Sequence, residues 1–457
     1  MSEKSDALQH GINAGVKINK FPGTSVLCRK DKLAGQYKMF KEEHGEQSFS
    51  FLPETFNVPE EKEELVKEME KKEGLWILKP PSSSCGHGIR LISKVSEIPE
   101  RTSKLCIQKY ISNPFLINGL KFDLRLYVLL TSIDPIRLYF YEDGLVRFAT
   151  KPYSSKREDR NNRFMHLTNY SINKMNSSFE FNENPSEFVG HKWSLRTLWK
   201  YLELQNVDHN EVINEIKDIV IKTILCGYNS MFEATQNVRG FSDYSCYKLF
   251  GVDILLDENL KPWLLELNDF PSLETPTLDR HVNEPMIAEM FNIVGFHITE
   301  KLNLKTRKIL NQKFGLKDVL AFNPGLYTTK KKFSQKMKED SFTKEKLPVK
   351  TILELTEAEN LTGRNLRLLL KSEEELHQTV NFTRIFPCKN SLKFLGYLAV
   401  PSYNDWLLES WETRYREQRV EGWKLLEELC KEGHHLENIE VNAKNMSKFL
   451  ANKKVEC

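Results

Sequence analysis

Residues 251–268 constrain the fold more than any other stretch of this 457-residue chain. They contain two apolar runs joined by a short polar segment, which predicts a β-hairpin. A turn centred on residues 259–260 would place Asp253 directly opposite Glu266, because both are equally far from that centre. Asn268 lies two residues beyond Glu266 and would project from the same face. The hairpin therefore predicts three oxygen-bearing side chains on one side of a sheet.

These three side chains predict a magnesium site. Two facing carboxylates, Asp253 and Glu266, repel each other unless a cation lies between them. Oxygen ligands with few protein contacts suit Mg²⁺, which keeps coordination positions for water and nucleotide phosphates. On these residues alone, a hairpin with a solvated polar face remains the alternative.

The composition is typical of a soluble globular protein, with 40% apolar and 28% charged residues. No apolar run is long enough to span a bilayer, and the first residues lack the order of a secretory signal. The eight cysteines form no Cys-x-x-Cys pair, which favours a reducing compartment and argues against disulfides and zinc.

The net charge of +3 conceals a strongly basic segment. Residues 301–350 contain 14 Lys or Arg against 4 Asp or Glu, a balance of +10, so the rest of the chain carries about −7. Such a segment indicates an acidic macromolecular partner, with a solvated linker as the alternative. Few aromatic residues are interleaved with its lysines, so we expect no nucleic-acid partner.

Strand-forming and helix-forming segments are mixed along the chain, which predicts an α/β (α+β) fold. A short strand is expected at 49–53, and a self-paired hairpin at 137–149 with its turn at 142–144. The other expected strands are 75–79, 89–92, 105–111 and 123–131. The expected helices are 28–40, 60–73, 193–204, 211–228, 283–294, 361–376 and 403–430.

Lys79 ends an apolar strand, where a lysine is costly to desolvate unless it meets an anion. A loop rich in serine and glycine follows, and Gly86 and Gly88 would let backbone N–H groups approach a phosphate. The loop is not a P-loop, because no Gly-Lys-Ser/Thr ending and no helix follow it. An ordinary turn is the alternative.

Further charged residues alternate along the next strand. Lys121, Asp123 and Arg125 would share one strand face, while the apolar residues between them face a core. Arg147 lies among apolar residues, and residues 166–171 offer an amide and hydroxyl groups. Together these groups suit ATP-dependent chemistry on an acidic acceptor.

Six motifs, taken in order, resemble the tubulin–tyrosine ligase-like family, and most closely its type 4 tubulin polyglutamylases. The likeness is strong over residues 17–300 and looser in the C-terminal part. The motifs are Trp-Ile-Leu-Lys-Pro at 76–80, Ile-Gln-Lys-Tyr-Ile at 107–111, Lys-Phe-Asp-Leu-Arg at 121–125, Asp-Gly-Leu-Val-Arg-Phe-Ala at 143–149, His-Leu-Thr-Asn-Tyr-Ser-Ile-Asn-Lys at 166–174, and Asp-Glu-Asn-Leu-Lys-Pro-Trp-Leu-Leu-Glu-Leu-Asn at 257–268.

The resemblance implies an ATP-grasp fold, in which α/β lobes hold ATP between antiparallel sheets. The implied division is a shortened N-terminal lobe at 1–59, a central lobe at 60–152, a C-terminal lobe with the Mg²⁺ site at 153–300, a basic segment at 301–350 and a helical extension at 351–457. Residues 1–320 together would form the catalytic domain.

The resemblance also implies roles for individual residues. Lys79, Arg147 and Glu266 would be catalytic, and Asp253, Glu266 and Asn268 would hold Mg²⁺, as two ions. Arg147, Tyr170, Ser171, Lys174 and Asn268 would bind the incoming amino acid. ATP would contact Lys79, Cys85, Gly86, His87, Gly88, Gln108, Lys109, Tyr110, Ile111, Lys121, Asp123, Thr168 and Asn169.

The implied reaction is a ligation. ATP phosphorylates an acceptor carboxylate, and the amino group of free L-glutamate attacks the acyl phosphate to form an isopeptide bond. The implied partner is the acidic tail of tubulin or microtubules, and the implied location is the cytoplasm and cytoskeleton, with the cilium or basal body as further expectations. A catalytically silent microtubule-binding protein and a glycine ligase are the alternatives.

Four positions depart from the family pattern and keep those alternatives open. Cys85 stands where an arginine is usual, and His87 where the residue is often apolar or basic. Residues 269–271, Asp-Phe-Pro, replace a segment that usually has serine or asparagine before the proline. Asn283 occupies the place of a lysine expected near the incoming amino acid.

Overall fold

The computed structural model describes residues 17–71, 74–82, 86–100, 104–238, 241–242, 244–273, 277–295, 298–299, 321–322 and 349–436. Cys85 and nearly all of the basic segment 301–350 lie outside these residues, so their predicted roles remain predictions. Within the described residues, no helix combines the length and apolar character that a bilayer crossing requires.

The smaller of the two main sheets is antiparallel and carries Lys79 at the end of a central strand. Its strand order is β1 (Thr55–Val58), β4 (Leu105–Lys109), β2 (Trp76–Lys79) and β3 (Arg90–Ile92). The charged helix α3 (Lys62–Lys71) packs its one fully buried residue, Leu65, into the apolar core of this sheet. The expected strand at 49–53 is wrong, since the strand begins at Thr55.

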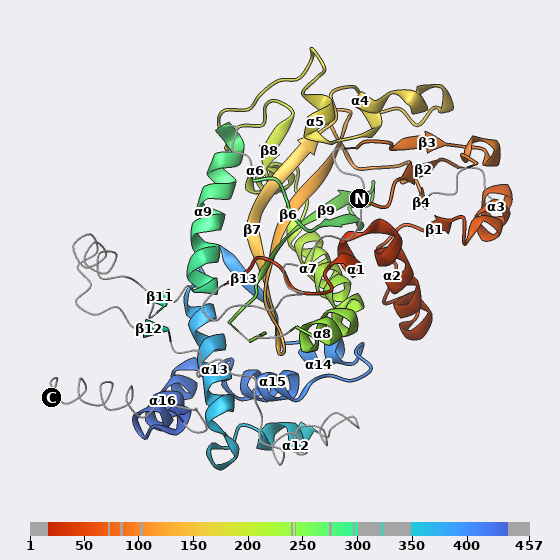
Figure 1. Ribbon diagram of the computed structural model, residues 1–457. Helices are drawn as coiled ribbons and strands as arrows, with labels where there is room; N and C mark the ends of the chain where they lie inside the picture. The colour runs from red at the N-terminus through yellow and green to blue at the C-terminus, as the bar shows by residue number, and fades with distance from the viewer. Residues whose placement is uncertain are drawn as a thin grey trace.

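The larger sheet is also antiparallel and forms the centre of the molecule (Figure 1). Its order is β10 (Pro262–Asn268), β9 (Lys248–Leu256), β6 (Leu120–Ile133), β7 (Ile136–Phe148) and β13 (Phe382–Phe386), with β5 (Leu116–Ile117) paired to β6 and β8 (Lys192–Ser194) paired to β7.

Helices cover both faces of the larger sheet, so its strands alternate between two apolar layers. Phe122, Leu124 and Leu126 of β6 enter the main core, together with apolar residues of α6 (Leu195–Leu204) and α7 (His209–Cys226). Tyr127 and Leu129 point the other way, into a second core that includes residues of α9 (Thr277–Val294). Figure 1 shows α9 running along this second face.

Smaller helices complete the described fold. These are α1 (Ser25–Cys28), α2 (Lys30–His44), α4 (Arg163–His166), α5 (Tyr170–Asn173), α8 (Tyr228–Gln236), α12 (Val349–Glu354), α13 (Gly363–His377), α14 (Ser391–Leu395), α15 (Tyr403–Tyr415) and α16 (Arg419–Lys431). The predicted helices at 361–376 and 403–430 are confirmed, the second with a break at 416–418.

The predicted self-paired hairpin at 137–149 is wrong. Strand β7 runs unbroken through this region and pairs along its length with β6. Residues 141–143 absorb an irregularity in the pairing, between Gly144 and Phe140, instead of turning the chain. A Cβ atom on Gly144 would lie 2.6 Å from the carbonyl oxygen of Arg125, so the glycine serves the close approach of two strands.

The C-terminal part is joined to the larger sheet through strand β13 and a buried ion pair. Strand β13 extends the edge at β7, with Phe382 opposite Tyr141. Arg137 of β7 donates to Glu375 of α13, with Nε 2.8 Å from Oε2, and each side chain is only 2% exposed. The C-terminal helices therefore share a continuous interior with the sheet that carries Asp123, Arg147 and Asp253.

Candidate active site

The hairpin of β9 and β10 brings Asp253 and Glu266 together, as predicted. The two residues are register partners, and Asn268 pairs with Gly251 one step further along. The pairs nearest the turn would place Leu265 opposite Asp253, but a register shift at Leu265 inserts one residue and brings Glu266 into that place. The predicted pairing is confirmed, and the bulge is its physical cause.

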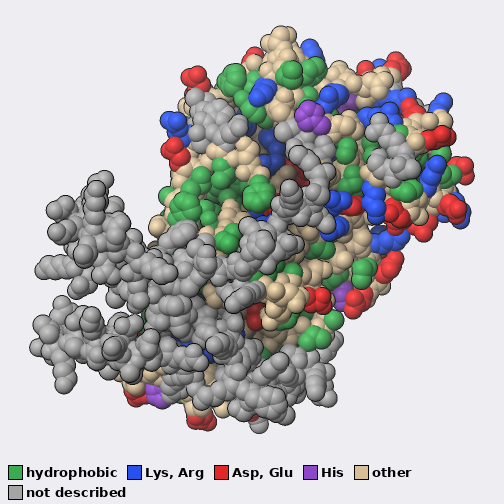
Figure 2. Space-filling view, viewed as in Figure 1, with side chains coloured by type: hydrophobic (Ala, Val, Ile, Leu, Met, Phe, Trp, Pro, Cys, Tyr) green, Lys and Arg blue, Asp and Glu red, His purple; other side chains and the backbone are tan. Residues whose placement is uncertain are grey.

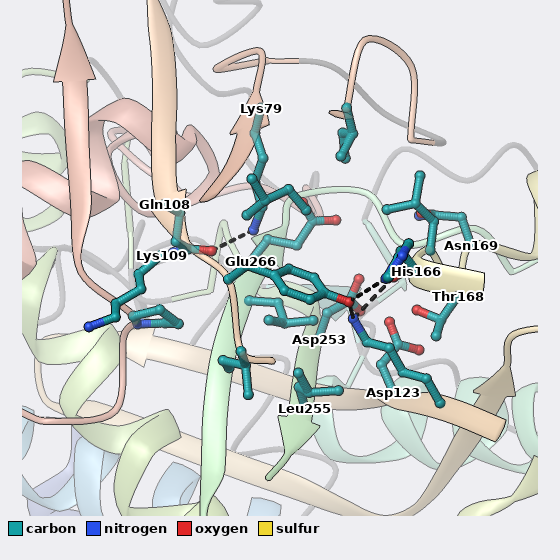
Figure 3. Close-up of a pocket in the computed structure, with 18 residues that line it drawn as sticks. Lys79, Gln108, Lys109, Asp123, His166, Thr168, Asn169, Asp253, Leu255 and Glu266 are labelled. Carbon is teal, nitrogen blue, oxygen red and sulfur yellow. Dashed lines mark hydrogen bonds between the residues drawn. The ribbon is translucent and has the colours of Figure 1, made fainter. Parts of the chain in front are cut away.

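A cleft opens between the two sheets (Figure 3). Its lining also includes Pro53, Ile77, Ile89, His166, Leu167, Leu255 and Leu265. Eleven of the predicted site residues line it: Lys79, Gln108, Lys109, Tyr110, Ile111, Lys121, Asp123, Thr168, Asn169, Asp253 and Glu266.

Lys79 reaches into the cleft from the end of β2, as Figure 3 shows. Its Nζ donates to Oε1 of Gln108 at 2.6 Å, and Nε2 of Gln108 donates to Oγ1 of Thr55, which fixes the amide orientation. Burial lowers the pKa of Lys79 to about 8. An amide oxygen only partly satisfies a buried ammonium, so this lysine is prepared for an anion.

Lys121 forms a second buried cationic position. Its Nζ donates to the hydroxyl of Tyr110 at 2.9 Å and to the carbonyl of His166 at 3.0 Å. Burial lowers its pKa to about 7. Burial and the nearby Lys121 lower the pKa of His166 to about 4, so its ring is neutral and its Nε2 can donate to the carbonyl of Asp159.

Two arginines surround Asp253. Arg125 forms a two-point contact, with Nε 2.6 Å from Oδ1 and Nη2 3.1 Å from Oδ2. Arg147 lies 3.0 Å from Oδ2 and also holds Asp123. Burial opposes ionisation, but the two guanidinium charges outweigh it and hold the pKa of Asp253 well below its ordinary value.

Side-chain cations, rather than a metal alone, can offset the repulsion between the facing acids. Lys30 of α2 lies 2.9 Å from Glu266, while Asp253 is held by arginines. Asn268 does not line the cleft, and its buried Nδ2 has no hydrogen-bond partner among the described residues. The sequence predicted that three oxygen-bearing side chains face the cleft. Asp253 and Glu266 line it, and Asn268 does not.

The donor set nevertheless fits a magnesium ion that arrives with an anion. Among the described residues, no three His, Cys, Asp or Glu side chains could surround one metal ion, so this site would combine two acids with an amide. With both lysines protonated, the forms that a bound anion favours, five cations against three carboxylates leave two positive charges in excess, which suits a metal-bound polyphosphate. The cations are Lys30, Lys79, Lys121, Arg125 and Arg147, and the carboxylates are Asp123, Asp253 and Glu266.

The glycine loop lies beside the cleft but does not line it. Gly86 has a φ of +71°, and a Cβ atom there would lie 2.6 Å from Cδ1 of Ile172 and 3.0 Å from Oδ1 of Asn169. Gly88 also has a positive φ, and His87 between them is exposed. Glycine is thus required where the loop meets the segment that presents Thr168 and Asn169.

The residues predicted to bind the amino acid lie on neighbouring elements. Tyr170, Ser171 and Lys174 lie on or directly after α5. The Nζ of Lys192 lies 4.3 Å from the ring centre of Tyr170, and Lys192 is the register partner of Arg147. Through Lys192, Tyr170 is therefore linked to Arg147, which is also predicted to bind the amino acid.

Several functional candidates were missed from the sequence. The sequence placed Arg125 on the same strand face as Lys121 and Asp123 but gave it no role in the site. Lys192 pairs with Asp279 at 2.6 Å, and Lys30 reaches Glu266 from a distant helix. No sequence signal connects these last two pairs, because tertiary packing alone brings them together.

The Asp-Phe-Pro departure has a local structural role. Lys248 is fully buried, and its Nζ lies 2.9 Å from Asp269 and 3.8 Å from the ring centre of Phe270. Phe270 itself is 67% exposed. The aromatic ring therefore covers a buried lysine beside the hairpin that carries Glu266.

Two antiparallel sheets with a positively charged cleft between them agree with the ATP-grasp fold that the sequence predicted. The chain belongs to the Tubulin-tyrosine ligase family, whose sequence pattern matches residues 8–303. This membership confirms the resemblance seen in the six motifs.

Individual relatives cover most of the chain. Tubulin monoglutamylase TTLL4 of Mus musculus is 37% identical over 432 residues, which span 92% of this chain and 35% of that protein. Tubulin polyglutamylase ttll-4 of Caenorhabditis briggsae is 33% identical over 428 residues, 93% of this chain and 68% of that protein. Tubulin polyglutamylase TTLL5 of Mus musculus is 34% identical over 392 residues, 84% and 29% of the two chains. The chain thus spans about a third of the mouse proteins.

Proposed function

We propose that this protein is an ATP-dependent ligase that adds free L-glutamate to glutamate side chains in the acidic tails of tubulin. The observation that carries the proposal is the pairing of Asp253 with Glu266 at a cleft that also holds Lys79 and Lys121. The names of the relatives, tubulin monoglutamylase and tubulin polyglutamylase, support the same reaction.

ATP and Mg²⁺ are the proposed cofactors. Asp253, Glu266 and Asn268 would hold Mg²⁺, as two ions, which would supply neutralising charge at the transferring phosphoryl group. Lys79 and Lys121 would contact the phosphates, and residues 108–111, which also line the cleft, would lie beside the base. Cys85, Gly86, His87 and Gly88 would cover the phosphates.

Side chains of this protein would orient the two carboxylates that take part in the reaction, that of the incoming amino acid and that of the acceptor. Arg147 would bind the α-carboxylate of the amino acid through its planar fork, and Tyr170, Ser171 and Lys174 would contribute to the same site. In this structure that fork holds Asp123 and Asp253. Arg147 would thus connect the amino acid to Asp253, one of the acids proposed to hold Mg²⁺.

The acidic acceptor would be held by charge. The segment 301–350 carries a balance of +10 and would attract the tubulin tail, with an affinity that falls as salt rises. A protein that modifies tubulin would act in the cytoplasm, on the cytoskeleton. The cilium or basal body is a further proposed location. The proposed domains are residues 1–59, 60–152, 153–300, 301–350 and 351–457.

Incorporation of labelled glutamate into purified tubulin tests the proposal. We expect incorporation that requires ATP and Mg²⁺ and that is lost in Glu266→Gln. The matched control is Glu258→Gln in the turn of the same hairpin, where the carboxylate accepts a hydrogen bond from the exposed Asn113 side chain. Glycine incorporation in place of glutamate would overturn the substrate assignment, and equal signals from wild type and Glu266→Gln would overturn the ligase assignment.

A further inference from the structure

Lys30 connects the two sheets that border the cleft. It is the first residue of α2, which contacts β1 and β4 of the smaller sheet, while the preceding helix α1 contacts β10 of the larger sheet (Figure 1). The backbone N of Lys30 donates to the carbonyl of Pro81, just beyond Lys79, at 3.2 Å. Its Nζ lies 2.9 Å from Oε2 of Glu266. One residue thus contacts the chain beyond Lys79 and an acid proposed to hold Mg²⁺.

The contact between Lys30 and Glu266 differs from the contacts of the neighbouring acid. Arg125 and Arg147 hold Asp253 from strands of the same sheet, and Arg125 does so through two hydrogen bonds. Lys30 reaches Glu266 from a helix, and the two side chains are 13% and 24% exposed. A lysine is a point charge on a flexible stem, so it can change partners while its backbone stays in place. Of these three cations, Lys30 can release its acid with the least rearrangement.

A divalent ion that binds Glu266 has to compete with Lys30. Both cations seek the same carboxylate, and they repel each other at short range. The other lysines and arginines of the cleft add to this repulsion, which disfavours a metal ion that arrives alone. A nucleotide reverses the balance, because its phosphates bring negative charge that can offset the lysine. Metal and nucleotide should therefore strengthen each other's binding through Lys30.

Phosphates bound at the cleft would come close to Lys30, because Lys79 lies near it. Burial does most to lower the pKa of Lys79, and at this short range Glu266 raises that pKa while Lys30 lowers it. Lys79 and Glu266 both line the cleft (Figure 3). A phosphate that contacts Lys79 would thus offset the charge of Lys30 as well.

We propose that Lys30 is an internal counterion that holds Glu266 against free divalent metal and releases it when the metal arrives with nucleotide phosphates. This inference rests on the proposed function, whose metal and nucleotide site it extends. Lys30 acts through Glu266 and is therefore a positioning residue. Its effect is to make metal loading depend on nucleotide.

Binding of Mn²⁺, as a probe for Mg²⁺, tests the inference in the full chain without nucleotide. The electron paramagnetic resonance signal of free Mn²⁺ reports how much metal is bound. We expect Lys30→Met to bind Mn²⁺ about tenfold more tightly than wild type, because the competing cation is gone. Lys30→Arg keeps the charge and should stay close to wild type. Damage to the fold would weaken metal binding, so it cannot produce the expected gain.

The same titration with a saturating non-hydrolysable ATP analogue measures the coupling. The factor by which the analogue tightens Mn²⁺ binding should fall about tenfold in Lys30→Met. Lys32→Met is the matched control, because it removes the same charge from the same turn of α2 at an exposed position. We expect it to match wild type in both titrations.

Unchanged or weaker Mn²⁺ binding by Lys30→Met would overturn the inference, and so would an equal gain in Lys32→Met. If Lys30→Met does not fold, Lys30→Gln decides, because its amide can still donate to Glu266 without carrying a charge. We expect Lys30→Gln to bind Mn²⁺ more tightly than wild type as well, and unchanged binding would overturn the inference.

These titrations need neither tubulin nor glutamate, so they separate the inference from the proposed function. If Lys30→Met gains Mn²⁺ affinity while wild type leaves tubulin unmodified, the role of Lys30 stands and the ligase proposal fails. If wild type modifies tubulin while Lys30→Met and Lys32→Met bind Mn²⁺ alike, the ligase proposal stands and the role of Lys30 is wrong.

Discussion

Arg147 holds Asp123 through two hydrogen bonds, from Nε to Oδ1 at 2.7 Å and from Nη2 to Oδ2 at 2.6 Å. The same Nη2 lies 3.0 Å from Oδ2 of Asp253 on the neighbouring strand. One buried guanidinium thus connects an acid of β6 with an acid of β9. This contact makes the arrangement of the site depend on the planar shape of arginine as well as on its charge.

Arg147→Lys tests that dependence. A single ammonium cannot reach both carboxylates in the same way, so one buried acid loses its partner. We expect kcat/KM for glutamate ligation to fall roughly a hundredfold, which corresponds to about 3 kcal/mol. Arg196→Lys, at an exposed contact with Asp143, is the charge-conserving control. Full activity in Arg147→Lys would show that only the positive charge matters.

Nucleotide binding should take up protons. Burial lowers the pKa of Lys79 to about 8 and that of Lys121 to about 7, so at pH 8 much of this pair is neutral without a ligand. A triphosphate favours the charged forms and raises both pKa values. Titration calorimetry of Mg-ATP in buffers of different ionisation enthalpy should show uptake of about one proton at pH 8, and less in Lys79→Met. Identical heats in all buffers would contradict the assignment.

Breaking the ion pair between Arg137 and Glu375 should destabilise the whole molecule. Arg137→Met would leave the Glu375 carboxylate buried without its main partner, which costs about 3–5 kcal/mol. Urea unfolding followed by circular dichroism measures this loss. Lys431→Met, at an exposed pair with Glu427, should change stability little. A small effect at Arg137 would mean that the C-terminal helices contribute little to the stability of the sheet.

Glu409 should make stability depend on pH. Burial raises its pKa to about 7 from an ordinary value of 4.5, so its carboxyl group favours the protonated form in the folded state. Its contribution to stability is therefore complete below pH 4.5 and is lost as the pH rises towards 7. We expect Glu409→Gln to stabilise the protein by roughly 2–3 kcal/mol at pH 8 and to have little effect at pH 4.5.

Thermal unfolding at the two pH values measures this difference. The exposed Glu421→Gln serves as control, because its carboxylate pairs with the exposed Lys424. Equal stabilisation by Glu409→Gln at both pH values would contradict the assigned direction of the shift.

The sequence predicted those features that depend on local periodicity. The alternation of Lys121, Asp123 and Arg125 with apolar residues fixed which face of β6 enters the core, and the structure confirms it. The pairing of Asp253 with Glu266 was also predicted. The bulge at Leu265 was not, because a single extra residue leaves no signal in the hydrophobic pattern.

Features set by tertiary contacts could not be predicted from the pattern. The residues 142–144 resemble a turn, but a longer strand pairing overrides that preference. The cations that hold Glu266 and Asp279 come from segments far away in sequence, Lys30 and Lys192.

Surface charge offers one further view of the site. Lysine and arginine side chains gather on the upper part of the face shown in Figure 2, around the region where α4 and α5 lie in Figure 1. A surface of this kind beside the cleft is compatible with the acidic acceptor proposed above.

Mass spectrometry of tubulin tails tests the central claim most directly. Purified tubulin would be incubated with ATP, Mg²⁺, glutamate and either wild type or Glu266→Gln. The account predicts tails heavier by whole glutamate residues, attached at glutamate side chains, with wild type alone. Unmodified tails with wild type, or equal modification by Glu266→Gln, would contradict it.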